Sequence, residues 1–291
     1  MSDRIGIGVC ILPDAPWSEV VDTWRAAEDL GFGHAWTYDH LTWSGLPDHA
    51  WFAAFPTLAA AAGVTSRIGL GTFVSSPNTH HPAQLVREAL SLHDLSEGRF
   101  LLGIGAGGDT DASVAWPGAT IGERSARFRE FTAIVGELLR SDGVGFDGTH
   151  YRFERADSLP GPPNAEGRIG IPLLVAANGP KALALAAREG DGWITYGGKA
   201  STDAAWWELV AGAAERMDQT RASAGRSRPL RRILGLDSAP TYPFGGVDLF
   251  EDAVGRAAAL GFTDVVCTWP RTSPPYAGSP DTVRRVAARL L

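Results

Sequence analysis

The sequence is poor in the features that define several large classes of protein. Its 291 residues include two cysteines, Cys10 and Cys267, with no CxxC and no zinc-type spacing. Because both lie on apolar runs far apart in the chain, we expect buried small hydrophobes rather than a disulfide framework or a zinc site. We expect no catalytic metal either, since no carboxylates stand at ligand spacing from His80 and His81.

Runs of basic residues and long apolar runs are also missing. The net charge is −7, so nucleic acid and anionic membrane surfaces are not the expected partners. No apolar stretch is long enough to cross a bilayer. The first residues lead straight into a strand pattern, without a signal-peptide or lipidation pattern. We therefore expect a cytoplasmic protein that acts on a small molecule.

The sequence does contain a repeated alternation of strand and helix patterns. The joint at Gly31-Phe32, where glycine ends a helix in a left-handed cap, recurs at Gly261-Phe262. Strands are expected at 5–12, 34–38, 68–74, 100–104, 172–176, 193–195, 232–236 and 265–268. Helices are expected at 20–30, 56–62, 82–95, 124–139, 181–189, 204–224, 250–260 and 281–291. This alternation favours an α/β fold of the (β/α)8 TIM-barrel type, as one domain over residues 1–291, rather than an open doubly wound sheet.

Two segments interrupt the alternation. Residues 143–153 read as a small hairpin insertion with Asp147-Gly148 at its turn, and a polar, proline-rich connection follows at 158–167. In such barrels the chemistry lies on the loops that follow the strands. We expect these loops at 38–50, 75–81, 105–120, 178–179, 196–201, 237–246 and 270–279, gathered at one end of the barrel.

The segment 67–82 is the strongest candidate for a ligand wall. It begins as a buried strand and then presents Phe73-Val74, a bulky apolar pair, directly before Ser75-Ser76-Pro77-Asn78. Serine, proline and asparagine form turns and bond to nearby backbone groups. An apolar pair beside small polar residues at a strand end suits the back of a ring-shaped ligand. An ordinary strand that runs into a surface turn fits the same pattern.

Asp39 and His40 directly follow the second expected strand. Histidine exchanges a proton near neutral pH, and a carboxylate can orient it. Adjacent side chains do not face each other, so we expect His40 to point toward a substrate and Asp39 to accept from a cofactor NH or hydroxyl group. The alternative is a turn capped by Asp39 and a packed His40.

Two further strand ends suggest anion sites. Asn178-Gly179-Pro180 joins a strand to a helix, and the exposed amides of a helix N-terminus bind phosphate. A plain strand-to-helix turn would look the same. The glycines of 103–108 do not match the dinucleotide fingerprint, because we expect no helix to begin directly after them.

Taken in order, these motifs resemble the bacterial luciferase-like superfamily of flavin- or deazaflavin-dependent oxidoreductases, which are built on a (β/α)8 barrel. The motifs that carry the resemblance lie at 38–40, 71–77, 81–82, 95–100, 102–107, 123–128, 176–179 and 190–193. Their placement is most similar to the branch that uses the deazaflavin coenzyme F420, close to the sugar-phosphate dehydrogenases.

The resemblance implies a role for each matching residue. Phe73-Val74 would form a bulge with a non-proline cis peptide that supports the bent isoalloxazine, and His40 would be the acid/base beside the hydride-accepting carbon. Trp43 would be one wall of the substrate pocket, and Lys199 stands where a relative contacts substrate phosphate. The cofactor contacts implied are Asp39, Phe73, Val74, Ser76, Asp109, Asn178 and Gly179, with Asp109 near the ring or ribityl chain and Asn178-Gly179 at the phosphate.

One departure limits what the resemblance implies. Ala106 stands where the sugar-phosphate enzymes place a carboxylate, so we carry over the cofactor and hydride chemistry but not the sugar phosphate. The expected function is hydride transfer between F420 and a small organic substrate, by a homodimer. An FMN-dependent luciferase-like monooxygenase is the alternative, and a barrel that binds a flavin without turnover is a third hypothesis.

Overall fold

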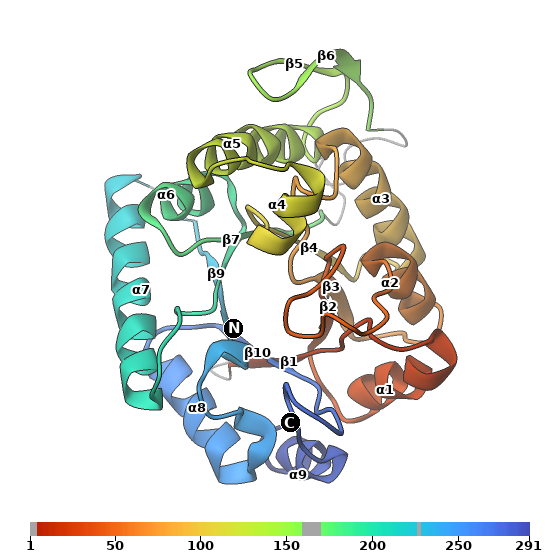
Figure 1. Cartoon of the computed structure of the whole chain (residues 1–291), viewed down its shortest axis with the longest axis vertical. Coiled ribbons are helices and arrows are strands. Elements are labelled where there is room, and N and C mark those ends of the chain that lie inside the picture. The colour runs from red at the N-terminus through yellow and green to blue at the C-terminus, as the bar shows by residue number, and fades with distance from the viewer. Residues whose placement is uncertain (1–4, 159–169, 226–227) are drawn as a thin grey trace.

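The protein folds as a closed barrel surrounded by helices (Figure 1). The structure is a computed structural model that describes residues 5–158, 170–225 and 228–291. Parallel strands close the barrel in the order β1-β10-β9-β8-β7-β4-β3-β2. These strands are β1 Gly6–Cys10, β2 His34–Thr37, β3 Gly69–Thr72, β4 Phe100–Ile104, β7 Leu173–Ala176, β8 Gly192–Thr195, β9 Arg231–Gly235 and β10 Asp264–Thr268. The predicted (β/α)8 barrel is confirmed.

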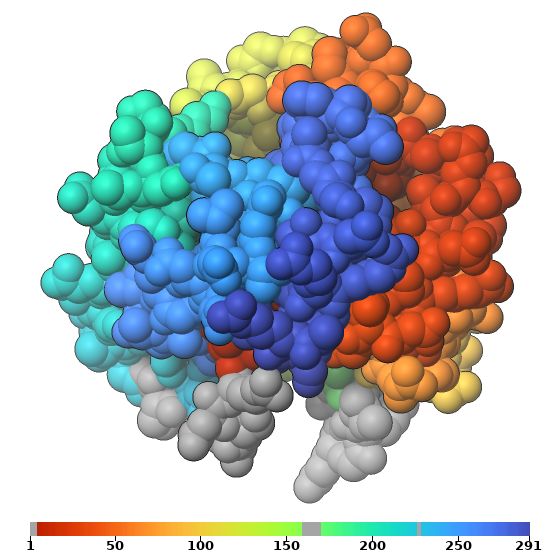
Figure 2. Space-filling view, turned by 90° about the horizontal axis from the view of Figure 1, so that it is seen from below, coloured from red at the N-terminus to blue at the C-terminus, as the bar shows by residue number. Residues whose placement is uncertain are grey.

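Helices alternate with these strands and form the outer ring in Figure 1. The helices are α1 Trp17–Asp29, α2 Ala54–Ala62, α3 Pro82–Leu95, α5 Ile121–Leu138, α6 Pro180–Glu189, α7 Asp203–Ser223, α8 Val247–Ala259 and α9 Pro280–Leu290. Seen from below in Figure 2, α8 and α9 cover the barrel side by side next to α1. Gly31 and Gly261 have φ values of +90° and +77°, which confirms the two predicted left-handed helix ends.

The expected hairpin is also present. Strands β5 Val144–Asp147 and β6 Arg152–Ala156 pair antiparallel outside the ring, beyond α5 (Figure 1). The Glu130 carboxylate on α5 accepts from the backbone amide of His150 over 2.8 Å and so holds the hairpin turn. Because the hairpin does not join the barrel, β4 pairs directly with β7. The connection predicted at 158–167 lies, apart from Ser158, outside the described residues.

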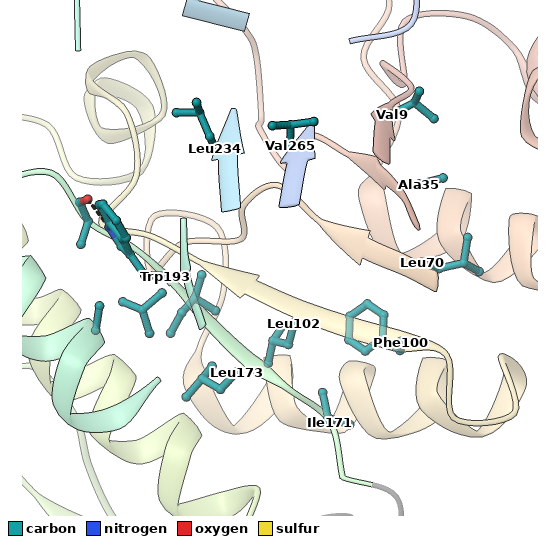
Figure 3. Packing of buried hydrophobic residues seen from close by; sticks show 14 of the residues in the cluster. Val9, Ala35, Leu70, Phe100, Leu102, Ile171, Leu173, Trp193, Leu234 and Val265 are labelled. Carbon is teal, nitrogen blue, oxygen red and sulfur yellow. Dashed lines mark hydrogen bonds between the residues drawn. The ribbon is translucent and has the colours of Figure 1, made fainter. Parts of the chain in front are cut away.

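Each barrel strand divides its side chains between two cores. One position in two faces the helices, where a large apolar cluster includes Val9, Ala35 and Leu70 (Figure 3). The alternate positions face the barrel interior, where Trp36 and Leu174 belong to a second cluster. Strands buried on both faces explain the nearly continuous apolar runs of the sequence. Cys10 and Cys267 are buried free thiols, as expected.

One helix contradicts the sequence prediction. Helix α4, Asp109–Ala115, begins directly after the glycine segment, with Gly108 at its N-cap, where we expected no helix to begin. Its seven residues are too few for a hydrophobic repeat to be visible in the sequence. In Figure 1 it lies across the front of the barrel, over the end where β4 finishes. The loop expected at 105–120 is therefore partly helical.

Candidate active site

The loops that follow the strands meet at one end of the barrel. Side chains from these loops contact each other directly: Asp39 bonds to Ser75, His40 to Asp111, and Trp43 stacks on Tyr276. These pairs join the segments 38–50, 75–81, 105–120 and 270–279, which we expected at the same end. That prediction is confirmed, and Figure 1 looks onto this end.

The Phe73–Val74 peptide bond is cis, as the resemblance implied. Before it, the Phe73 amide donates to the carbonyl of Thr37 on β2 over 2.8 Å. After it, the Ser75 amide donates to the carbonyl of Gly103 on β4 over 2.9 Å. The chain therefore leaves the sheet for two residues only. Both Phe73 and Val74 contact the apolar cluster inside the barrel while staying partly exposed.

Glycines of the neighbouring β4 segment make room for this bulge. A Cβ atom on Gly105 would lie 2.7 Å from a methyl carbon of Val74, and one on Gly103 would lie 2.1 Å from the carbonyl oxygen of Thr72 and 3.1 Å from Val74. Contacts this short do not occur between real side chains, so these strand positions require glycine. The β4 segment therefore packs directly against the bulge without intervening side chains.

Asp39 is buried and joins the second and third strand ends. Its Oδ2 accepts from the Ser75 hydroxyl over 2.5 Å and lies 2.7 Å from His80 Nε2. The other ring nitrogen of His80 lies 3.4 Å from the Glu88 carboxylate. The hydroxyl of Ser76, the serine expected at the cofactor, accepts from the backbone amide of Asn78.

His80 carries the positive charge of this cluster. Burial alone lowers the pKa of His80, but the hydrogen bonds to Asp39 and Glu88 outweigh it and raise the pKa to about 9. The imidazole is therefore charged at neutral pH and partly neutralises two carboxylates. Sequence reasoning considered His80 only as a metal ligand. The position of His80 in the sequence, a few residues after the bulge, did not indicate that Asp39 and Glu88 would be its partners.

His40 has a carboxylate partner that sequence reasoning missed. Its Nδ1 lies 2.6 Å from Oδ2 of Asp111, on α4. The other oxygen of Asp111 accepts from the amide of Leu41 over 3.0 Å. Asp111 is only 1% exposed, and both of its carboxylate oxygens have partners, so its side chain is held in place. When Asp111 accepts from Nδ1–H, the Nε2 atom of His40 is left to exchange a proton.

Asp109, the carboxylate that we expected near the cofactor, lies on the outer side of the same helix. It pairs with Arg124 over 2.5 Å and its side chain is 91% exposed. Arg127 is buried one turn further along α5, where it donates to the Asn78 side chain and lies under the Trp116 ring. These contacts hold α4 and the bulge segment against α5.

The Asn178-Gly179 segment caps the start of α6. Gly179 is the N-cap, Pro180 follows it, and no side chain bonds to the first amides of the helix. A Cβ atom on Gly179 would meet nothing within 4 Å. Asn178 accepts from the Thr195 hydroxyl over 2.6 Å and is thereby held against β8. The helix N-terminus is therefore open to an anion, as the sequence indicated.

Comparison with known proteins agrees with this arrangement. The family model described as luciferase-like monooxygenase matches residues 4–236. The chain belongs to the luciferase-like monooxygenase family. The resemblance seen in the sequence is thus confirmed at the level of the family.

Curated relatives in this family include enzymes named for coenzyme F420. An F420-dependent glucose-6-phosphate dehydrogenase of Beutenbergia cavernae is 39% identical over 178 residues, which is 60% of this chain and 51% of the relative. An F420-dependent hydroxymycolic acid dehydrogenase of Mycobacterium tuberculosis is 32% identical over 220 residues, 74% of this chain and 59% of the relative. The chain thus spans about half the length of these relatives.

Solved luciferase-like structures share the fold over nearly the whole chain. The F420-dependent tetrahydromethanopterin reductase of Methanopyrus kandleri superposes with a TM-score of 0.75 at 18% identity, over 99% of this chain and 98% of the reductase. An F420-dependent secondary alcohol dehydrogenase, solved with an F420-acetone adduct, gives 0.79 at 15% identity, over 99% and 98%. At these identities the likeness supports the barrel alone.

The remaining wall of this luciferase-like barrel mouth is aromatic. Trp43 stacks on Tyr276 with ring centroids 6.0 Å apart and planes 14° apart, and it lies 5.5 Å from the Tyr38 ring. The Tyr38 hydroxyl donates to Asp237 over 2.8 Å. Burial raises the pKa of Asp237, which also accepts from the amide of Thr268.

Three predictions concern features outside this wall. Lys199 is exposed in the segment between β8 and α7. No cluster of three or more metal-ligating side chains occurs among residues 5–158, 170–225 and 228–291. Over the same ranges, no helix has both the length and the apolar character to cross a membrane.

Proposed function

We propose that this chain is an oxidoreductase that transfers a hydride between coenzyme F420 and a small organic substrate. One observation carries the proposal: His40, fixed at Nδ1 by Asp111, lies at the same barrel rim as the Phe73–Val74 bulge. The curated relatives named F420-dependent dehydrogenases support the choice of coenzyme. The bulge, the open helix end and a fixed imidazole together form a set of groups suited to such a cofactor.

The residues at the rim fit a deazaflavin. Phe73, Val74 and Ala176 are apolar and partly exposed, so they offer a surface to a planar ring. The uncapped start of α6 at Gly179 offers free amides and the positive end of a helix dipole to a phosphate. Asp39, buried beside Ser75, is an acceptor for a cofactor NH or hydroxyl group.

Bound F420 would supply the hydride chemistry, and the protein would supply orientation and proton transfer. Nε2 of His40 would take the hydroxyl proton when an alcohol is oxidised and return it when a carbonyl is reduced. Asp111 acts by positioning: it holds Nδ1–H and so keeps Nε2 in the accepting form. Trp43 would form part of the substrate wall.

Anaerobic turnover tests this proposal. The purified chain is mixed with oxidised F420 and a panel of alcohols, and separately with reduced F420 and the matching carbonyl compounds, while the deazaflavin absorbance is followed. The proposal predicts an absorbance change with at least one pair in at least one direction. Turnover only with reduced FMN and oxygen would support the FMN-dependent monooxygenase instead. Saturable F420 binding without turnover on any pair would support the non-catalytic barrel.

We also propose a single domain over residues 1–291, a homodimer, a cytoplasmic location, and cofactor contacts by Ser76 and Asp109. The side chain of Asp109 is 91% exposed and is therefore accessible to a cofactor. The sugar-phosphate reaction of the curated relatives is not part of the proposal.

A further inference from the structure

Four polar side chains connect the surface of α3 with the segment after the bulge. Oε2 of Glu88, on α3, lies 3.4 Å from Nδ1 of His80, and Nε2 of His80 lies 2.7 Å from Oδ2 of Asp39. The same Oδ2 accepts from the Ser75 hydroxyl over 2.5 Å. We call Glu88, His80, Asp39 and Ser75 the polar bridge. The exposed fraction of the side chains falls from 30% at Glu88 to 11% at His80 and 9% at Asp39, so the inner charges are largely shielded from water and interact strongly.

The geometry of the polar bridge fits a doubly protonated His80. Each of its ring nitrogens faces a carboxylate oxygen. A neutral imidazole has one N–H, so its other nitrogen would turn a lone pair toward an ionised carboxylate, which only accepts. An imidazolium donates from both nitrogens. Burial lowers the pKa of His80, but its contacts with Asp39 and Glu88 raise it to about 9, in agreement with this geometry.

The surroundings of His80 add no further charge. The ring centroid of Phe55, on α2, lies 5.6 Å from that of His80, and α2 has no charged residue. On α3, Gln84 donates to Oε1 of Glu88 over 3.0 Å, while Oε2 faces His80. His81 turns its ring to the hairpin. Apart from the two carboxylates of the polar bridge, no charged group of the described residues shifts the pKa of His80.

The polar bridge uses only one oxygen of Asp39. Ser75 and His80 both meet Oδ2, whereas Oδ1 makes no hydrogen bond to a described residue and is not sealed from solvent. Because Oδ2 is held from two directions, the carboxylate keeps one orientation and Oδ1 is a fixed acceptor beside the Phe73–Val74 bulge. Loss of the His80 proton would remove one of the two donors and the only positive charge of the bridge.

We infer that His80 is a positioning residue of the cofactor site: it holds the Asp39 carboxylate ionised and in one orientation, so that Oδ1 accepts an N–H group of the bound deazaflavin. The inference rests on the proposed function and adds a residue to its cofactor site. His80 acts through Asp39 and makes no contact with the cofactor itself. Cofactor affinity therefore depends on the charge of a side chain outside the binding surface.

The charge of His80 is measured first on the chain without cofactor. Nuclear magnetic resonance of ¹⁵N-labelled histidine distinguishes protonated from unprotonated ring nitrogens, and His80→Gln identifies the His80 signals. We expect both nitrogens of His80 to be protonated at pH 7, and one of them to lose its proton near pH 9. A neutral His80 ring at pH 7 would overturn the inference.

Fluorescence titration with F420 then measures the effect on the cofactor. At pH 7, His80→Gln should weaken F420 binding about tenfold, the lower end of what a hydrogen bond to a charged group contributes. As pH rises through the His80 pKa of about 9, the wild type loses the cation and this ratio should shrink toward 1 at pH 10. Ionisation of the coenzyme itself affects both proteins alike and cancels in the ratio. Equal affinities at pH 7, or a ratio that is independent of pH, would contradict the role of His80.

A conservative variant separates charge from shape. Arginine keeps its positive charge at pH 10, so His80→Arg should bind F420 more tightly than His80→Gln at pH 7 and keep that advantage at pH 10. His81→Asn is the matched control, because asparagine can replace the neighbouring histidine as the cap that accepts from the Ala83 amide. It should bind F420 as the wild type does at both pH values. Equal losses in His81→Asn and His80→Gln would overturn the inference.

A double-mutant cycle tests whether His80 acts through Asp39. Asp39→Asn removes the charge that His80 holds, so adding His80→Gln to Asp39→Asn should weaken F420 binding by less than about twofold. An undiminished tenfold loss in the Asp39→Asn background would show that His80 acts by another route, and the inference would be wrong.

The inference and the proposed function fail in different ways. F420 turnover by the wild type, with unchanged F420 affinity in His80→Gln, would leave the reaction standing and remove the role of His80. The expected His80 dependence of F420 binding, without turnover on any alcohol or carbonyl compound, would leave the role standing and remove the reaction. No saturable F420 binding at either pH would remove both. Circular dichroism of each variant, compared with the wild type, separates a local loss of binding from a failure to fold.

Discussion

His40 and His80 follow strands that are neighbours in the barrel, yet their partners give them different electrostatic roles. His80 lies between Asp39 and Glu88 and is held charged, with its pKa raised to about 9. His40 pairs with the Asp111 carboxylate through Nδ1, which leaves its Nε2 atom for a ligand. We therefore propose His40 for proton transfer, while His80 balances the charge of its two carboxylate partners.

Substitution of His40 tests the proton-transfer role. General acid–base help is typically worth about 10²–10⁴-fold in rate, so His40→Ala should lower turnover by about that factor. Cofactor affinity should barely change, because the bulge and the α6 N-terminus hold the cofactor. Steady-state kinetics with F420 binding by fluorescence measures both. His93→Ala, on α3, is the control and should affect stability alone. Full turnover in His40→Ala, or loss of the cofactor, would show that the role is wrong.

His80 predicts a pH-dependent contribution to stability. Its folded pKa of about 9 lies above the unfolded value of about 6.5. The stabilisation is therefore complete below the unfolded pKa and is lost as pH rises through the folded pKa. The difference in melting temperature between the wild type and His80→Gln should be largest near pH 6 and shrink toward pH 10. His49→Gln, an exposed histidine, should show no such trend; a constant His80 difference would contradict the account.

The sequence predicted some of the candidate site residues and missed others, and the reason is physical. Asp39, His40 and the bulge pair lie at strand ends, where chain position predicts the site. Asp111 was missed and Asp109 chosen because both belong to one short helix, where two residues of separation turn one carboxylate inward and the other to solvent. Side-chain direction in an unforeseen helix cannot be read from spacing.

At the scale of elements, the strands around the bulge determine its shape. A Cβ atom on Gly105, directly after β4, would lie 2.7 Å from Val74, and one on Gly103 of β4 would lie 2.1 Å from the carbonyl oxygen of Thr72. The longer elements matched their hydrophobic periodicity closely: α3, Pro82–Leu95, has the predicted bounds. Helix α4 was not predicted, because its seven residues, with an acidic first turn, are too few to show a hydrophobic repeat.

Gly105→Ala tests whether the bulge supports the cofactor. The added methyl group must displace Val74, so F420 affinity should fall about tenfold or more, with overpacking costing roughly 1–3 kcal/mol of stability. Gly255→Ala on α8 has open space around its Cβ and should be neutral or stabilising by up to about 1 kcal/mol. Fluorescence titration and thermal unfolding give the two readouts. Unchanged F420 affinity in Gly105→Ala would remove the bulge from the binding site.

Glu28 links α1 to the start of β3. Its carboxylate accepts from the amides of Ser66, Arg67 and Ile68, at 2.6 to 3.1 Å. Burial raises the pKa of Glu28, but these hydrogen bonds outweigh it and lower the pKa to about 2. The link thus positions the strand that leads into the bulge.

Replacing Glu28 should therefore destabilise the fold in a pH-dependent way. Because its folded pKa is depressed, the stabilisation is present above the unfolded pKa near 4.3 and is lost as pH falls toward 2. Glu28→Gln should cost about 1–3 kcal/mol at pH 7 by chemical unfolding, less in acid. Glu19→Gln, exposed in the first turn of the same helix, should cost only the helix-dipole contribution of about 0.3–1 kcal/mol; an equal loss in both variants would contradict the role.

At the scale of the whole molecule, the sequence predicted the barrel because eight strand patterns alternate with helix patterns along most of its length. Closure of the barrel brings side chains from the segments after β2, β3, β4 and β10 to one rim, which no local pattern reveals. The stacked pair of Trp43 and Tyr276, more than two hundred residues apart, arises in this way.

The central claim is that the rim binds a deazaflavin. A parallel fluorescence titration of the purified chain with F420 and with FMN, under the same anaerobic conditions, tests it most directly. The account predicts saturable F420 binding at least about tenfold tighter than FMN binding, a free-energy difference of about 1.4 kcal/mol. Tighter binding of FMN, or no saturable binding of F420, would contradict it.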